Sequence, residues 1–590
     1  MEIRKRTDFD ASMNVIDFIL RARGVRKADI PKFLFPDSSL EPDYNKLENI
    51  DEGIELLKSH LKAGSKLFIA IDPDMDGYSS STIIYQFITK DLKYSNVSYY
   101  VPKKKIHGIN TSVVLENKPE LLIVPDAGSS DFDEHKTLRE NGIDTLVIDH
   151  HLVEGNKYSD DALVINNQLS KGFQWKSLTG SSMAYLFVKA FIERLELDIN
   201  YEKYLDLNAI GLISDRADLR DTGAFYYASV GLKKVNNELI QFLVEKSQNL
   251  EVGKPLTPKD IGFEISPFLN AMTREGKEDD INLVVDALFG LDYEVYNSRL
   301  KIHCSVIEQA ARTMATTKNR QSKKVKEAME KIDERIKEKG TDENKIIFVN
   351  STGIIEDSGL NGLVATKISD KYKKPTLIMQ YYEDQQVLKG SGRNSRDSAI
   401  EDLRQFLEDT ELFNYVSGHA GAFGVGIGLQ EAASLIDVTN ELLADVEFDN
   451  VMHTVDLSYT GKADMEDILE IANHQHLWGE GLDSPLVHIH SIRLKKDDIK
   501  LIGNKGNTWK LNAGVDCIMF NLSEEQLLTL TKHDSDEIEI EIVGECSLNT
   551  FRGQKQPQVI IKDFDVKGVS PFDPSEDSPW SGIVVDELPF

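Results

Sequence analysis

Three short apolar runs near the start of the chain each end in an aspartate, and this pattern limits the possible folds more than any other feature. The runs cover residues 66–71 (KLFIAI), 121–125 (LLIVP) and 145–148 (TLVI), and the aspartates are Asp72, Asp126 and Asp149. Apolar runs of this length that alternate with helix-like stretches are typical of buried parallel strands. Ligands of a doubly wound sheet bind outside the carboxyl ends of its strands. The sequence therefore predicts an α/β fold, with a doubly wound parallel sheet whose acidic edge is the functional site.

The rest of the chain divides by composition. Residues 301–340 hold eleven Lys/Arg and six Asp/Glu, and we expect a long connecting helix there, either a solvated spacer or one that lines a phosphate path. Apolar runs at 345–350 and 376–379 predict a second, smaller α/β domain, and the strict alternation of 537–543 (EIEIEIV) predicts a strand of a small β-barrel. The expected boundaries are 1–45 (N-terminal lead-in), 46–300 (first α/β domain), 301–341 (connecting helix), 342–445 (second α/β domain), 450–567 (barrel) and 568–590 (acidic tail).

Charge and cysteine content narrow the class of protein. The net charge of −30 excludes a general nucleic-acid coat, so phosphate binding would need a local basic channel or metal ions. Three widely spaced cysteines exclude a disulfide framework and fit a reducing cytosol. No apolar stretch is long enough to span a membrane, and no secretory signal precedes the first domain. We expect a cytoplasmic monomer that has no membrane partner.

The acidic edge has the composition of a metal site. Asp72, Asp74 and Asp76 alternate before a glycine, as in an EF-hand loop, but Ile83 stands where that loop needs a bidentate glutamate. A preceding strand also argues against an EF-hand. Asp149-His150-His151 ends another strand, and so many carboxylates at one edge would repel one another without bound cations.

Oxygen and imidazole ligands favour Mn²⁺ or Mg²⁺ over zinc at this edge. Two such ions would clamp the attacking and leaving oxygens of a phosphoryl displacement. The cluster thus predicts metal-assisted hydrolysis of a phosphoester.

Four segments in chain order, DPDMDG, VPDAG, IDHH and GLISD, resemble the motifs of the DHH phosphoesterase superfamily. Later segments are similar to those of RecJ-like single-strand-specific exonucleases. They are 268–274 (FLNAMTR), 318–321 (KNRQ), 389–393 (KGSGR), 417–420 (SGHA), 478–485 (WGEGLDSP), 549–553 (NTFRG) and 559–563 (VIIKD). The resemblance covers about residues 50–567 and implies an oligonucleotide-binding (OB) fold for the barrel.

The resemblance implies a set of metal ligands, to which the strand-end pattern adds Asp149. The set is Asp72, Asp74, Asp76, Asp126, Asp149, His150 and Asp215. Asp126 would bridge the two ions, and His151 would face the substrate phosphate as ligand support or proton donor. The implied activity is hydrolysis of single-stranded DNA, 5′ to 3′, with release of 5′-mononucleotides, in recombination, repair or replication.

The expected substrate contacts are basic, polar and aromatic side chains spread along the chain. They are Lys104, Arg274, Ser391, Arg393, His419, Trp509, Phe551 and Arg552. Arginine suits a phosphate by its planar fork, and aromatic rings stack on bases; the alternative for Trp509 and Phe551 is burial in the barrel core. The sequence departs from the family motifs at Lys104, Thr273 and Ser417. These departures put substrate contacts in question, but they remove none of the implied metal ligands.

The last five residues, DELPF, resemble the acidic, Phe-terminated tip of bacterial single-stranded-DNA-binding protein (SSB). We expect Asp586, Leu588, Pro589 and Phe590 to bind a partner, either SSB or proteins that recognise its tip. The alternatives are an electrostatic plug over the chain's own DNA channel and a merely solubilising tail.

Two other functions remain open from the sequence. One is a DHH phosphodiesterase for short oligonucleotides or cyclic dinucleotides, which would leave residues 450–567 without a role. The other is a non-catalytic DHH scaffold in a replication complex, against which the full ligand set argues. An RNA substrate also stays possible, since no residue visibly tests for a 2′-hydroxyl.

Overall fold

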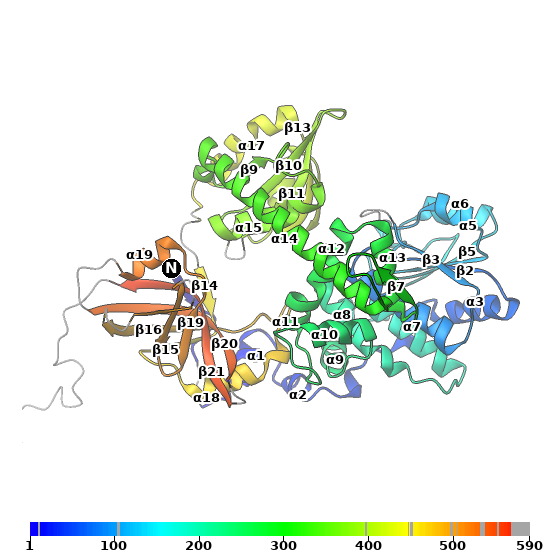
Figure 1. The fold of residues 1–590 in the computed structure, drawn as a ribbon, viewed down its shortest axis with the longest axis horizontal. Coiled ribbons are helices and arrows are strands. Elements are labelled where there is room, and N and C mark those ends of the chain that lie inside the picture. Colours follow the sequence, from blue (N-terminus) through cyan, green and yellow to red (C-terminus); the bar gives the residue numbers. More distant parts are fainter. Residues whose placement is uncertain are drawn as a thin grey trace, which may run out of the picture. The chain divides into compact units, whose positions relative to one another are not determined.

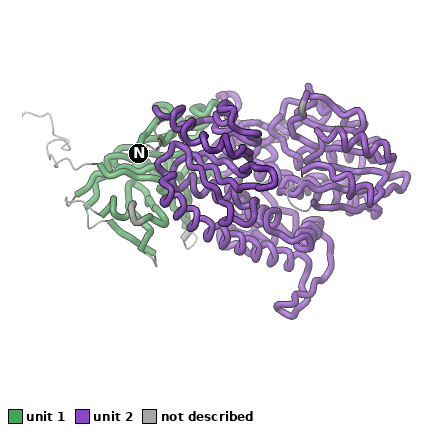
Figure 2. Tube along the Cα trace, turned by 90° about the horizontal axis from the view of Figure 1, so that it is seen from above, with its two compact units in different colours: residues 1–24, 452–475, 484–590 green, residues 25–451, 476–483 purple. Residues whose placement is uncertain are grey.

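The computed structural model describes most of the chain as two compact units. The described residues are 1–9, 12–102, 107–395, 398–446, 448, 452–495, 499–503, 506–531, 537–551 and 554–567. One unit comprises the described residues of 1–24, 452–475 and 484–590, and the other those of 25–451 and 476–483 (Figure 2). Each unit is described by itself below. No helix among the described residues is both long enough and apolar enough to cross a bilayer.

The larger unit contains the predicted doubly wound sheet, which confirms the expected fold class (Figure 1). Its five parallel strands run in the order β3-β2-β4-β5-β6. They are β2 (Leu67–Ala70), β3 (Val97–Tyr100), β4 (Leu121–Pro125), β5 (Asp144–Asp149) and β6 (Leu163–Asn166). Because the chain leaves β2 toward β3 and leaves β4 toward β5, the connections diverge between β2 and β4. This topological switch point is where such sheets bind ligands.

Helices cover both faces of this sheet. Phe68, Leu122 and Val147 lie in the core beneath α5 and α6, while the alternate residues of the same strands face α3, α4 and α7. The helices of this part are α2 (Ile30–Leu34), α3 (Ile50–Ala63), α4 (Met75–Gln86), α5 (Thr111–Asn117), α6 (Phe132–Glu140), α7 (Gly180–Arg194), α8 (Leu205–Ser214), α9 (Thr222–Gly231), α10 (Glu238–Lys246), α11 (Pro258–Asp260), α12 (Ser266–Glu275) and α13 (Glu278–Phe289).

The expected connecting helix is α14 (Val306–Lys339), and it follows a hairpin that the sequence reading missed. β7 (Glu294–Asn297) and β8 (Ile302–Ser305) pair antiparallel, so residues 302–305 form a strand where the connecting helix was expected to begin. The Ser305 side chain then caps α14 by accepting a hydrogen bond from Glu308 N at 3.2 Å. The first part of α14 packs on α12 and α13, and its last turns enter the core of the second α/β part.

The second α/β part has a five-stranded sheet in the order β12-β13-β11-β10-β9, in which only β9 and β10 are parallel. Its elements are β9 (Ile347–Asn350), α15 (Asn361–Tyr372), β10 (Thr376–Tyr382), β11 (Val387–Arg393), α16 (Leu403–Glu408), β12 (Phe413–His419), β13 (Ala422–Gly428) and α17 (Leu429–Leu442).

The smaller unit is a mixed seven-stranded sheet in the order β15-β16-β20-β21-β19-β18-β17. The strands of this sheet are β15 (Leu457–Thr460), β16 (Leu486–Lys495), β17 (Lys500–Ile502), β18 (Thr508–Asn512), β19 (Asp516–Met519), β20 (Glu537–Phe551) and β21 (Gln554–Lys567), and a further strand, β14 (Met452–Val455), belongs to a separate two-stranded sheet. Two helices, α18 (Met465–Asn473) and α19 (Glu524–Thr531), accompany them. The expected alternating strand at 537–543 forms the start of β20.

Part of the N-terminal lead-in belongs to this smaller unit. β1 (Glu2–Lys5) pairs parallel with β14, and α1 (Val15–Ala22) packs on α18. Arg6 and Arg23 form ion pairs at 3.2 and 2.8 Å with Asp456, whose side chain is buried. The domain boundaries drawn from the sequence stay a prediction, but residues 1–24 pack as an integral part of the C-terminal fold.

Candidate metal centre

The loop after β2 is shaped by its three aspartates and by Gly77. Asp74 caps α4, because its Oδ1 accepts a hydrogen bond from Gly77 N at 3.0 Å. A Cβ at Gly77 would collide with the carbonyl oxygen of Asp72. The glycine therefore allows the close approach between Asp72 in the loop and the first turn of α4, which carries Asp76.

Asp76 is held in place by the first turn of α7. Its Oδ2 accepts a hydrogen bond from Gly180 N at 2.6 Å, and its Oδ1 accepts from Ser181 N at 3.0 Å and from Thr179 Oγ1 at 2.9 Å. Amides at a helix N-terminus stabilise a carboxylate. The Asp76 side chain is thus buried and anchored at the floor of the site.

Asp126, directly after β4, is the least satisfied group of the cluster. It is 1% exposed, and its backbone has φ 66°, a left-handed conformation that is rare for residues other than glycine. Its Oδ1 makes no hydrogen bond and lies 3.1 Å from His150 Nε2. Gly180 makes room for this carboxylate, since a Cβ there would collide with it. A buried oxygen that makes no hydrogen bond and lies beside a histidine nitrogen fits a cation ligand.

Asp149 contrasts with Asp126, since protein donors surround both of its oxygens. Its Oδ1 accepts hydrogen bonds from His150 N and His151 N at 2.7 and 3.2 Å and lies 2.8 Å from His151 Nδ1, while Oδ2 accepts from Ser129 N at 3.1 Å. Its place at the end of β5 thus orients the two histidines. Direct metal ligation by Asp149 remains a prediction.

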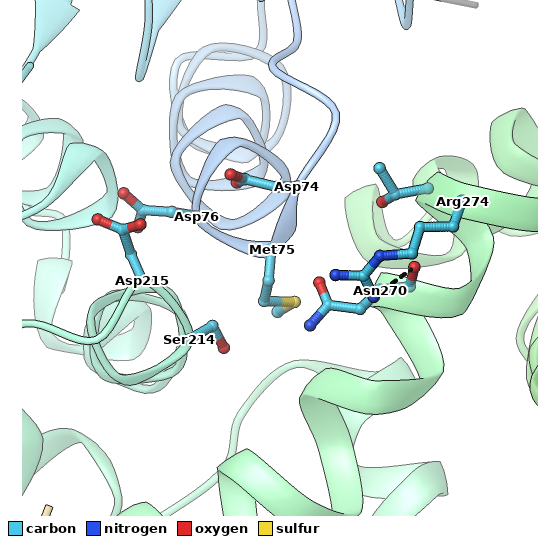
Figure 3. A pocket seen from close by; sticks show the side chains of 8 residues that line it. Asp74, Met75, Asp76, Ser214, Asp215, Asn270 and Arg274 are labelled. Carbon is cyan, nitrogen blue, oxygen red and sulfur yellow. Dashed lines mark hydrogen bonds between the residues drawn. The ribbon is translucent and has the colours of Figure 1, made fainter. Parts of the chain in front are cut away.

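Asp215 completes the cluster from the end of α8. It lies beside Asp76 in a pocket of about 180 Å³ that is also lined by Arg274 of α12 (Figure 3). The lining residues are Asp74, Met75, Asp76, Ser214, Asp215, Asn270, Thr273 and Arg274.

Three overlapping groups of these side chains bring ligand atoms within 4.8 Å of one another. The groups are Asp126 with Asp149, His150 and His151; Asp76 with His150 and Asp215; and Asp72 with Asp74 and Asp126. The predicted metal ligands therefore converge from β2, β4, β5 and α8, and the oxygen-rich donor set fits Mn²⁺ or Mg²⁺.

The metal-free site is electrostatically unfavourable. Burial and the charge of Asp72 raise the pKa of Asp74 to about 6. Burial and the charges of Asp76 and Asp74 raise the pKa of Asp215 to about 8. The pKa of Asp126 is raised well above its usual range, because it is buried among the same carboxylates. Bound cations would relieve this repulsion.

The histidine pair divides into two roles. Burial lowers the pKa of His150, which keeps the ring neutral as metal ligation requires. Burial opposes the charged form of His151 too, but the hydrogen bond and charge of Asp149 outweigh it and raise the pKa of His151 to about 9. His151 is therefore a cation at neutral pH, and its side chain is 57% exposed.

His107 belongs to the site although the sequence reading did not single it out. Its Nδ1 lies 3.0 Å from both carboxylate oxygens of Asp72. The loop that carries it is fixed by Asp131, which accepts a hydrogen bond from Ile109 N at 2.7 Å. Only the fold reveals this contact, because a lone histidine behind a lysine run carries no local signal.

The expected phosphate-binding residues share one side of the second sheet. Arg393 of β11 and His419 of β12 both pair with Ala422 of β13, so they lie in one row on one face. Ser391 shares that face with Arg393, and both side chains lie over Gly362 at the start of α15.

Arg393 also lies close to the first α/β part. Burial, followed by the charges of Arg274 and Arg216, lowers the pKa of the Arg393 guanidinium. Arg393 therefore lies near Arg274 and Arg216, and Arg274 lines the pocket beside the carboxylates.

Other predicted contacts are not supported or are not visible. Trp509 is fully buried in the smaller unit, where its ring packs edge-on against Phe564 at 5.2 Å. The prediction that Trp509 stacks on bases is therefore wrong, and Trp509 belongs to the core of the smaller unit. The side chain of Phe551 and the residues Lys104, Arg552, Asp586, Leu588, Pro589 and Phe590 lie outside the described part of the chain.

Comparisons with known proteins agree with this site. The model of the DHH family N-terminal domain matches residues 66–212, and that of the RecJ OB domain matches residues 455–563. A relative from Bacillus subtilis strain 168, named as the SPbeta prophage-derived single-strand DNA-specific exonuclease YorK, is 33% identical over 96% of this chain and 98% of its own length. The chain belongs to the RecJ-like exonuclease family.

More distant members of the family also align with nearly the whole chain. The single-stranded-DNA-specific exonuclease RecJ of Haemophilus influenzae is 27% identical over 93% of this RecJ-like chain and 95% of its own. Among solved structures, RecJ of Thermus thermophilus in complex with Mn²⁺ matches with a TM-score of 0.72 and 20% identity, covering 96% of this chain and 80% of that one. At this identity the structural match shows the shared fold.

Proposed function

We propose that this protein is a metal-dependent exonuclease that hydrolyses single-stranded DNA. The observation that carries the proposal is the convergence of carboxylates and His150 on a buried oxygen of Asp126 that makes no hydrogen bond. The family's relatives named as single-strand-specific exonucleases support the substrate class. The OB domain supports binding of strands longer than a dinucleotide.

In this proposal the chain supplies ligands for two Mn²⁺ or Mg²⁺ ions. The ligands would be Asp72, Asp74, Asp76, Asp126, His150 and Asp215, with Asp126 between the ions and Asp149 orienting the histidines. Such ions lower the pKa of a water and neutralise the phosphate oxygens. The α7 amides and the α4 cap hold Asp76 and Asp74 in place before any ion arrives.

His151 is the proposed proton donor. Asp149 fixes its Nδ1, so Nε2 is the nitrogen available to the substrate. As a cation at neutral pH, His151 favours the charge that develops on the phosphate and delivers a proton to the departing 3′ oxygen.

The arginine side of the pocket would hold the phosphates of the strand. Arg274 and Arg393 offer forked donors, Ser391 and His419 add contacts on the same sheet face, and Lys104, Phe551 and Arg552 would extend the path. We further propose 5′-to-3′ polarity with release of 5′-mononucleotides, and action as a monomer in the cytoplasm of a bacterial or phage-infected cell. The C-terminal DELPF would dock onto SSB or onto proteins that recognise its tip.

Digestion of end-labelled strands tests the activity and its direction. Single strands labelled at the 5′ or 3′ end, a matching duplex and a dinucleotide are incubated with Mn²⁺ or Mg²⁺. We expect labelled mononucleotide at once from the 5′-labelled single strand and little product from duplex or dinucleotide. Asp126→Asn should abolish the reaction, while Asp437→Asn, an exposed aspartate on α17, should not. Hydrolysis of the dinucleotide alone would instead favour a small-substrate phosphodiesterase.

A further inference from the structure

A short segment, 476–483, packs beside the metal centre although its neighbours on both sides belong to the other compact unit. Residues up to Gln475 and from Ser484 onward are part of the smaller unit, while 476–483 packs with the larger one. We call this segment the clip. Leu477 and Leu482 are fully buried. Two backbone hydrogen bonds between Gly479 and Leu482, at 2.9 and 3.1 Å, close it into a tight turn.

The clip forms hydrogen bonds with the loop that directly follows Asp215. Leu219 N donates to the carbonyl oxygen of Glu480 at 2.9 Å. The Glu480 carboxylate accepts two hydrogen bonds from the guanidinium of Arg216, at 3.0 and 2.9 Å. The loop is thus held once by its backbone and once by a charge-assisted side-chain contact, in which both Arg216 nitrogens donate to the same oxygen of Glu480.

The glycines of the clip allow this close approach. A Cβ at Gly481, whose φ is 76°, would collide with the Asp218 carboxylate. A Cβ at Gly479 would press into Leu219. The clip and the loop therefore fit in one arrangement only, and a side chain at either glycine would displace them.

These contacts are important because the conformation of the loop determines the orientation of the Asp215 side chain. Asp215 caps the end of α8, and Arg216, the next residue, has φ 60°. This left-handed conformation is unfavourable for arginine and persists only where surrounding contacts hold it. The contact that holds the Arg216 side chain is Glu480. A shift of the Arg216 backbone would turn the adjacent Asp215 away from Asp76 and His150.

We propose that the clip is a positioning device for the metal centre and that Glu480 is its positioning residue. Glu480 holds Arg216, the Arg216 backbone holds Asp215, and Asp215 completes the group with Asp76 and His150. This inference rests on the proposed role of Asp215 as a metal ligand. Both side chains of the pair are exposed, Arg216 by 69% and Glu480 by 43%, so the pair contributes little to stability and its loss should leave the protein folded.

Manganese titration of the full-length protein by calorimetry tests the clip without relying on nuclease activity. We expect Glu480→Ala to weaken Mn²⁺ binding by about 10-fold, as other losses of ligand-orienting contacts do. Glu480→Gln, which keeps an acceptor for Arg216, should recover part of that affinity. Gly481→Ala should act in the same direction. The matched control is Glu408→Gln, which removes an exposed glutamate that pairs with Arg404 on α16, and it should bind Mn²⁺ as the wild type does.

A kinetic readout separates positioning from general damage. With saturating Mn²⁺, Glu480→Ala should lower kcat and leave KM for single-stranded DNA within about twofold. Mn²⁺ affinity within twofold of the wild type in both Glu480 variants would overturn the proposal. If the wild type bound Mn²⁺ but cleaved no DNA, the proposed function would be wrong, while the effect of Glu480→Ala on Mn²⁺ affinity would still decide the clip.

Discussion

Asp74→Asn should stabilise the metal-free protein, although it removes a residue of the proposed active site. Asn keeps the oxygen that accepts the hydrogen bond of Gly77 N, so the cap of α4 is retained. What is lost is a carboxylate whose pKa rises from 3.8 to about 6 through burial and the neighbouring Asp72. The substitution therefore isolates the electrostatic cost of the cluster from its local structure.

The size of the effect follows from proton linkage. A carboxyl group with a higher pKa in the folded than in the unfolded state destabilises the fold progressively as the pH rises from about 4 to 6. Above pH 6 the cost is complete, at about 3 kcal/mol. We expect Asp74→Asn to raise the Tm of the larger unit by about 5 °C in EDTA at pH 8. The gain should vanish near pH 4, where the wild-type carboxyl is protonated in both states.

Thermal unfolding in EDTA and in Mn²⁺ checks this reasoning. Excess Mn²⁺ should stabilise the wild type by mass action and reverse the order of the two proteins, because the variant has lost a proposed ligand. Asp402→Asn provides the control, since Asp402 also caps a helix, α16, by accepting from Gln405 N at 2.8 Å. Its Tm should not rise. A variant at position 74 that melts below the wild type in EDTA at pH 8 would refute the argument.

Further substitutions test the rest of the site and the core. Gly180→Ala should lower Mn²⁺ affinity at least 10-fold, because its methyl group would collide with Asp126; calorimetry measures this. The rate of DNA hydrolysis should fall as the pH rises toward about 9, where His151 loses its proton. His151→Gln should lower kcat about 100-fold, and its rate should no longer fall between neutral pH and about pH 9. Trp509→Ala should destabilise the smaller unit by about 3–5 kcal/mol in denaturant unfolding; a loss of DNA affinity at unchanged stability would contradict its place in the core.

The convergence of the acidic residues could be predicted because parallel strands leave little choice. Once the runs before Asp72, Asp126 and Asp149 are recognised as parallel strands of one sheet, their carboxyl ends must meet at one edge. Asp215 has no such signal, since it follows a helix, and its assignment depended on the family resemblance. His107 approaches Asp72 through a loop, and loop paths are not encoded in any periodicity.

The sequence pattern bears on two features that differ from the leading expectation, and for Trp509 it favours the core alternative. Trp509 lies in the pattern TWKLN, where the two apolar residues alternate with polar ones, and in the structure Trp509 and Leu511 both face the core. This alternation favours burial over an exposed stacking role. The hairpin of β7 and β8 was lost in a polar stretch, because four-residue strands with mixed burial carry a weak alternation. In the sequence, only Val295 and Tyr296 of β7 indicate that the hairpin begins there.

The contrast between Asp126 and Asp149 indicates which carboxylates need a cation. Both are fully buried at neighbouring strand ends, yet hydrogen bonds and His151 hold the pKa of Asp149 below its usual range, against the effect of burial. Asp126 combines a left-handed backbone, an oxygen without a hydrogen bond and a strongly raised pKa. Each of these features is unfavourable alone, and one bound cation would relieve the last two. The fold thus satisfies the aspartate that orients the histidines and leaves unsatisfied the one that would bridge the metals.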